Sequence, residues 1–169
     1  GKLKFYINGS WVVSESDLVY EDVNPATGEV IAEFPSATDS EIEAAIDAAQ
    51  GAVAKWREVP LRDKARYLFD LRGKFEEHFE RLCRVLVQDH GRTIGEARGT
   101  LRRCIENIES ACSALLLLTK GECVTDLAKG LDQALYWEPR GVFLIITPKY
   151  IPMHAWSSYV PYALASGCP

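Results

Sequence analysis

The sequence has 169 residues, of which 47% are hydrophobic and 25% are charged, and its net charge is −5. These values are typical of one ordinary globular domain, and the acidic balance argues against a nucleic-acid partner. No apolar run is long enough to cross a membrane, and the N-terminus carries no apolar signal region. We therefore expect a cytoplasmic protein, with an organelle matrix as the alternative. The five cysteines form no Cys-x-x-Cys pair, which argues against a disulfide framework and a zinc site.

The N-terminal residues predict a small antiparallel β layer. Residues 4–13 contain Asn8-Gly9, a strong signal for a two-residue hairpin turn, and so predict two short strands. Residues 20–23 and 30–34 predict a second pair of strands. The turn between them, from Asn24 to Gly28, places Gly28 where a positive φ is needed.

Three helices are predicted next. The first begins near residue 38 and the third near residue 93, each with a capping box in which a threonine and a glutamate satisfy free amides (Thr38 with Glu41, Thr93 with Glu96). The second is predicted as one helix from Pro60 to Gly91, because a single apolar stripe runs through it. The third carries an apolar stripe that is typical of a helix packed along a neighbouring helix.

A strand–loop–helix unit is predicted after the helices. Residues 131–138 look like a strand that leaves the helical layer. Residues 142–146, VFLII, are apolar without alternation, as in a central strand of a parallel sheet. A helix follows from Pro152, with Pro161 expected to kink or shorten it. Ligands of open α/β sheets bind beyond the carboxyl ends of strands, so residues 147–152 are the candidate ligand edge.

The predicted strand at residues 142–146 has no partner within the sequence. A strand of this kind needs neighbours on both sides to satisfy its backbone groups. Either the remainder of the sheet is missing or another chain supplies it.

Five stretches, in this order, carry a family resemblance: FYINGSW (5–11), VNPATGEVIAEFPSAT (23–38), AAIDAAQGAVAKW (44–56), QDHGRTIGEARGT (88–100) and PRGVFLIITP (139–148). They resemble the N-terminal part of the NAD(P)-dependent aldehyde dehydrogenase superfamily, and most closely its methylmalonate-semialdehyde dehydrogenase type. The resemblance implies an α/β fold in which the β hairpin layer and three helices lead into the first unit of a Rossmann-type sheet, incomplete in this chain.

The resemblance also implies a division of the chain. Residues 1–120 correspond to the N-terminal part of a coenzyme-binding domain, residues 121–138 to a strand segment of an oligomerisation arm, and residues 139–169 to the start of the coenzyme sheet. A homo-oligomer is therefore expected, or a C-terminal remainder that completes the sheet. The implied partners are NAD and a small aldehyde, with no nucleic acid and no membrane.

The implied cofactor-binding residues are Thr147, Pro148 and Lys149, which match the family's loop at the nicotinamide end of NAD. Tyr150 stands where the family has an asparagine that donates a hydrogen bond to the oxyanion of the reaction intermediate. A phenol also donates, but from a longer side chain in a different place, and loss of one well-placed donor costs on the order of 100- to 1000-fold in rate. Lys149 replaces an aromatic residue and either pairs with a phosphate or faces water, which we favour.

The remaining chemical side chains are better explained by structure than by catalysis. Cys104 and Cys112 lie on or beside an apolar helical stripe and are expected in the core. Cys123 has no basic neighbour that would lower its pKa. His90 is expected at a helix end, where the macrodipole favours it. His154 lies near the candidate ligand loop and is the one histidine with a conceivable role there.

Two hypotheses follow. The first is the N-terminal part of an NAD-dependent aldehyde or semialdehyde dehydrogenase, which in the complete enzyme oxidises an aldehyde to an acid or acyl-CoA. By resemblance the nucleophilic cysteine lies beyond Pro169, so the 169 residues alone are expected to be inactive. The alternative is a free-standing truncated relative that acts as a non-catalytic interaction module.

Overall fold

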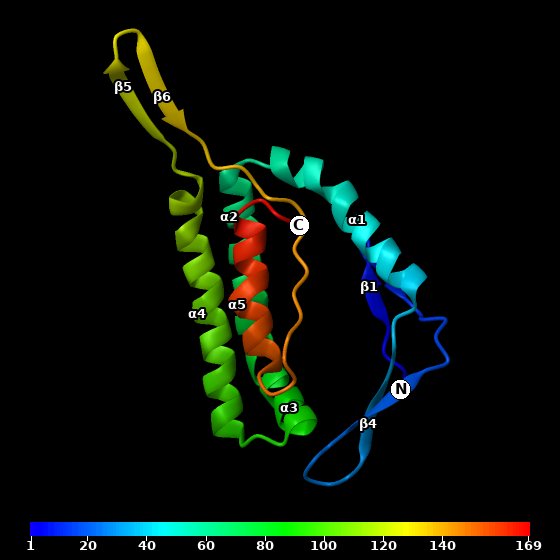
Figure 1. Ribbon diagram of the computed structural model, residues 1–169. Helices are drawn as coiled ribbons and strands as arrows, with labels where there is room; N and C mark the ends of the chain where they lie inside the picture. Colours follow the sequence, from blue (N-terminus) through cyan, green and yellow to red (C-terminus); the bar gives the residue numbers. More distant parts are fainter.

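The computed structural model describes residues 1–169, except for the side chain of Leu118. Two β hairpins come first, then four helices, a third hairpin, an extended segment and a last helix. Helices α2, α4 and α5 lie side by side, with α3 at one end of this bundle (Figure 1). Helix α1 (Asp39–Glu58) leads from the N-terminal hairpins to the bundle.

The N-terminal β layer is confirmed. Strands β1 (Phe5–Ile7) and β2 (Ser10–Val12) pair antiparallel, and both turn residues between them have positive φ, 50° at Asn8 and 76° at Gly9. Strands β3 (Val19–Val23) and β4 (Val30–Pro35) form the second hairpin, with φ 75° at Gly28. The positive φ values explain why asparagine and glycine occupy these turns.

Both predicted capping boxes are present. The Thr38 hydroxyl accepts from the Glu41 amide at the start of α1, and the Glu41 carboxylate accepts from the Thr38 amide. The same reciprocal pair begins α4 (Ile94–Thr119), between Thr93 and Glu96. Each box satisfies amides that have no partner within the helix.

The prediction of one helix between Pro60 and Gly91 was wrong. Two helices occupy this range, α2 (Leu61–Glu77) and α3 (Phe79–His90), separated at His78 with φ −104° and ψ 12°. No proline, glycine or cap signals the break, and the apolar stripe continues across it because both helices pack on α4. The structure therefore has four helices before the third hairpin.

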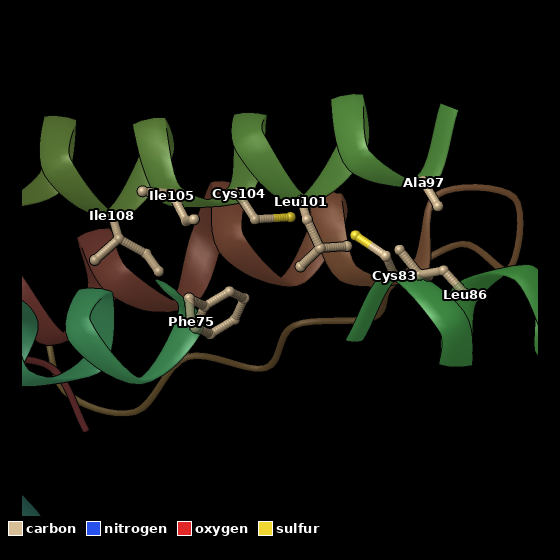
Figure 2. Packing of buried hydrophobic residues seen from close by; sticks show 8 residues of the cluster. All are labelled: Phe75, Cys83, Leu86, Ala97, Leu101, Cys104, Ile105 and Ile108. Carbon is tan, nitrogen blue, oxygen red and sulfur yellow. The ribbon is translucent and has the colours of Figure 1, made fainter. Parts of the chain in front are cut away.

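The hydrophobic core follows α4. Its buried residues face α2, α3 and α5, and eight of the cluster are drawn in Figure 2 (Phe75, Cys83, Leu86, Ala97, Leu101, Cys104, Ile105 and Ile108). The ring of Trp156 on α5 stacks on Phe75 of α2, with centroids 5.8 Å apart. Cys104 is fully buried, as expected for a core residue.

The third hairpin projects from the end of the bundle. Strands β5 (Glu122–Ala128) and β6 (Leu131–Leu135) pair antiparallel, and every residue in both is exposed (Figure 1). Only a strand over 131–138 was predicted; β6 ends earlier, and β5 was missed because its polar residues hide the alternation. Its turn contains Gly130, with φ 76°.

The predicted strand at residues 142–146 was also wrong for this chain. The segment runs alongside α5 but has no ladder to another strand (Figure 1). Leu144 and Ile146 are 85% and 82% exposed, whereas a central strand would bury them. The physical reason is that no neighbouring strand is present among residues 1–169. The Rossmann-type sheet is therefore not formed here.

The last helix, α5 (Pro152–Ala165), runs through Pro161 and is not shortened by it. Pro161 is fully buried in the packing of α5. Across the helices that the structure describes, none combines the length and apolar character needed to cross a bilayer.

Candidate functional site

The loop before α5 brings the predicted site residues together at one end of the bundle. Thr147, Pro148, Lys149 and Tyr150 are consecutive and all exposed, and α5 begins directly after them. The Tyr150 residue is 66% exposed, so its phenol is free to meet a ligand. The loop lies beside α3 (Figure 1).

The N-terminus of α5 faces this loop. Ile151 is its N-cap residue, Pro152 occupies the first turn, and no side chain caps the helix. The partial positive charge of such an end favours an anionic group in front of it. His154 is half-buried in the first turn, and its backbone carbonyl accepts from the hydroxyls of Ser157 and Ser158.

Arg92, in the link between α3 and α4, binds the loop that precedes α5. One guanidinium nitrogen donates to the backbone carbonyl of Tyr150, and another donates to Thr100 Oγ1 at 3.1 Å. Its Nε lies 3.4 Å from His90 Nδ1, a long and weak contact. The loop conformation is thus tied to the start of α4 and the end of α3.

A pocket of about 310 Å³ lies behind the loop, between β3, the end of α3 and Lys149. It contains the Asp89 carboxyl, whose pKa is raised above its ordinary value of 3.8 by burial and by the Asp22 carboxyl on β3. Lys149 lowers that pKa in part, so its charge acts on this pocket. Lys149 is exposed, and its preference for water over a phosphate stays a prediction.

Replacing Asp22 with asparagine should stabilise the protein at neutral pH. The native state holds the Asp89 proton more tightly than the unfolded chain, so stability falls as pH rises from 3.8 through the raised native pKa. Removing the like charge lowers that pKa, and we expect a gain below about 1 kcal/mol because the pair is partly solvated. Denaturant unfolding between pH 4 and 8 measures it.

The matched control is Glu21→Gln, which neutralises an exposed carboxylate on the same strand. It should leave the slope of stability against pH unchanged. Equal slopes for the wild type and Asp22→Asn would contradict the coupling between the two aspartates.

A larger apolar groove of about 560 Å³ lies between residues 143–148 and α5. Leu144 and Ile146 line one side, and Tyr159 and Tyr162 line the other. The apolar side chains of Leu144 and Ile146 are therefore open to this groove and are not packed in a core.

Three of the cysteines have surroundings that do not suit a nucleophile. Burial raises the pKa of the Cys83, Cys104 and Cys112 thiols, which keeps them protonated. Cys123 is exposed on β5, at the hairpin rather than at the loop. Within the part of the chain that the structure describes, no group of three metal-ligating side chains could hold an ion.

A family model described as "Aldehyde dehydrogenase family" matches residues 11–169. The chain belongs to the aldehyde dehydrogenase family. The resemblance found in the sequence is thereby confirmed, over nearly the whole chain.

Curated members of the aldehyde dehydrogenase family include similar proteins. Malonate-semialdehyde dehydrogenase 1 from Geobacillus kaustophilus is 38% identical over 165 residues, and malonate-semialdehyde dehydrogenase from Listeria monocytogenes is 38% identical over 166. In both comparisons the match covers 98% of this chain and 34% of the relative. The chain therefore spans about a third of the length of the curated relatives that it matches.

Solved aldehyde dehydrogenase structures share this fold. Methylmalonate-semialdehyde dehydrogenase from Oceanimonas doudoroffii matches with a TM-score of 0.93 and 35% identity, over 98% of this chain and 34% of that chain. A putative methylmalonate-semialdehyde dehydrogenase from Sinorhizobium meliloti, in complex with NAD, matches with a TM-score of 0.95 and 28% identity, over 99% and 34%. The similarity in fold therefore extends over at least 98% of the chain.

Sequence reasoning missed two contributors to this site. Arg92 lies within the stretch QDHGRTIGEARGT but was not singled out, because its acceptor is a backbone carbonyl 58 residues away. The pairing of Asp22 with Asp89 joins β3 of the second hairpin to α3 and also leaves no local pattern.

Proposed function

We propose that residues 1–169 are the N-terminal third of an NAD-dependent semialdehyde dehydrogenase that oxidises an aldehyde to an acid or acyl-CoA. The observation that supports this most strongly is the 38% identity to malonate-semialdehyde dehydrogenases over 98% of the chain. The similar fold of a methylmalonate-semialdehyde dehydrogenase supports the same substrate class. A short aldehyde with a carboxylate is the proposed substrate.

The residues present suit one end of NAD. Thr147, Pro148 and Lys149 are exposed in front of the uncapped N-terminus of α5, where a polar ligand can approach their backbone. We assign them to the nicotinamide end. By resemblance the groups that hold the phosphates and the ribose lie beyond Pro169. When bound, NAD supplies the acceptor for the hydride of the aldehyde.

Tyr150 is assigned to the aldehyde side of the same loop. A thiolate that adds to an aldehyde carbonyl creates an oxyanion, and a hydrogen-bond donor at that oxygen lowers the barrier. The exposed phenol of Tyr150 can donate one hydrogen bond, whereas Cys83, Cys104 and Cys168 are buried. The nucleophile of the proposed reaction therefore comes from outside residues 1–169.

The three parts of the chain have separate proposed roles. Residues 1–120 form the scaffold of the coenzyme-binding domain and hold the loop through Arg92, and residues 139–169 start the coenzyme sheet. Residues 121–138 form an oligomerisation arm. The support for the arm is its projection from the bundle with exposed apolar residues (Val124, Leu127, Leu131 and Leu135). A cytoplasmic or organelle-matrix location completes the proposal.

The proposed function is tested with the complete protein that carries residues 1–169. Malonate semialdehyde and methylmalonate semialdehyde should each drive formation of NADH, measured by its absorbance. Propanal, which lacks the carboxylate, serves as the control and should react with a lower kcat/KM. No formation of NADH with either semialdehyde would contradict the proposal.

Residues 1–169 alone should show no aldehyde oxidation, because the proposed nucleophile is outside them. The second candidate, a non-catalytic interaction module, is supported by the exposed arm and the uncovered residues 142–146. Size-exclusion chromatography of residues 1–169 mixed with a malonate-semialdehyde dehydrogenase distinguishes the two. Co-elution with a dehydrogenase subunit would support the module; measurable turnover by the 169 residues alone would contradict both.

A further inference from the structure

We propose that Arg92 is a positioning residue, which fixes the backbone of the ligand loop so that Tyr150 and Lys149 point into the reaction site. This inference rests on the proposed function of the loop. It concerns a side chain that acts through the peptide that follows Tyr150.

The hydrogen bonds of Arg92 converge from three parts of the fold. They reach the Tyr150 carbonyl in the loop, Thr100 Oγ1 on α4 and His90 Nδ1 at the end of α3. A planar guanidinium holds its donors in a fixed fork, so contacts in different directions fix its orientation. Arg92 therefore fixes the position of the loop relative to α3 and α4, which both pack in the core.

Two of the acceptors, the Tyr150 carbonyl and the Thr100 hydroxyl, are uncharged groups. Arg92 lies within ion-pair distance of no carboxylate among the described residues, although its charge contributes to lowering the pKa of the Glu96 carboxyl. Arg98, by contrast, pairs with Glu80 at 2.9 Å. An arginine whose role was only surface charge pairing would be expected beside a carboxylate. Hydrogen bonds from a charged donor are about twice as strong as neutral ones, so the bond from Arg92 to the Tyr150 carbonyl is a strong one.

That carbonyl controls the direction of the site side chains. Ile151 is the N-cap of α5, and its carbonyl accepts from the Ala155 amide, so the helix fixes the chain only from Ile151 onward. Arg92 extends this order by one residue, because binding the Tyr150 carbonyl sets the peptide plane between Tyr150 and Ile151. That plane contains the Cα of Tyr150, so fixing it limits the backbone rotation that directs the Tyr150 side chain.

The test uses Arg92→Met and Arg92→Lys in the complete protein, with Arg98→Met as the matched control. Displacement of a reacting group by about 1 Å can cost on the order of 100-fold in rate. We expect Arg92→Met to lower kcat by about 10- to 100-fold with KM for the aldehyde changed less than about threefold. Lysine retains one donor and should recover part of the loss. Arg98→Met should keep the wild-type kcat.

Hydrogen–deuterium exchange supplies a second readout that does not depend on activity. The amides of Lys149, Tyr150, Ile151 and Met153 should exchange at least about tenfold faster in Arg92→Met than in the wild type, while those of α4 keep their rates. Unchanged exchange in the loop would overturn the proposal. So would a kcat equal to that of the wild type, or equal kcat losses in Arg92→Met and Arg98→Met.

The two proposals fail in different ways. If the wild-type protein oxidises no aldehyde, the proposed function is wrong, and exchange in the loop still decides whether Arg92 holds it. If Arg92→Met does not fold, Arg92→Lys takes its place, because a lysine cannot bind the Tyr150 carbonyl and Thr100 Oγ1 together as the guanidinium does. Arg92→Lys should then raise exchange in the loop, and no increase would overturn the proposal.

Discussion

Replacing Tyr150 with asparagine should raise the kcat of the complete protein for a semialdehyde by about 100-fold. By resemblance an asparagine amide at this position donates to the oxyanion, and one well-placed donor is worth on the order of 100- to 1000-fold in rate. The Tyr150 phenol extends from an exposed residue and meets that oxygen less directly. Steady-state formation of NADH measures the change.

The control for this prediction is Tyr150→Phe, which keeps the ring and removes the hydroxyl. It should lower kcat, by less than about tenfold, because the phenol is a poorly placed donor. An unchanged or lower kcat for Tyr150→Asn would contradict the assignment of this position to the oxyanion. The proposed positioning role of Arg92 would be unaffected by that result, since Arg92 binds the backbone carbonyl of Tyr150 and not its side chain.

Replacing Leu101 with alanine should destabilise residues 1–169 by about 3 kcal/mol. Leu101 is fully buried on α4, where it faces the helices around the core (Figure 2). Truncating a buried leucine removes its transfer free energy and leaves a cavity that closes only in part. Urea unfolding followed by circular dichroism measures the free energy of unfolding.

Leu116→Ala is the matched control for that prediction. It makes the same change on the same helix, but Leu116 is 72% exposed. Its effect should stay within about 0.5 kcal/mol. Equal destabilisation by the two substitutions would contradict the placement of the core along the Leu101 face of α4.

Local chemistry made several elements predictable from the sequence. The Asn8-Gly9 turn and the two capping boxes depend on residues within a few positions of each other, so their sequence patterns carry their structure. The burial of Cys104 followed from its place on an apolar stripe. The division of the chain at residues 120 and 138 stays a prediction.

Elements that depend on distant or absent partners were not predictable. Residues 142–146 have the composition of a central strand, but a strand forms only when a neighbour pairs with it. The break at His78 lacks any sequence signal, because the packing on α4 continues on both sides of it. Pro161 was expected to disturb α5, yet tertiary packing buries it within the helix.

The candidate site was likewise predictable only in part. Its loop was found from the end of an apolar run followed by a helix, and its residues were assigned by resemblance. The contacts that hold the loop come from α3 and α4, through Arg92, and only the structure shows them. A backbone carbonyl as acceptor leaves no residue type that a sequence pattern could reveal.

The intact mass of the native protein that carries these residues tests the central claim most directly. We predict a single polypeptide about three times heavier than 18.9 kDa, because the chain covers 34% of the semialdehyde dehydrogenases that it matches. The residues described here would then be the coenzyme side of a dehydrogenase. A native mass of 18.9 kDa would contradict that account and favour an interaction module.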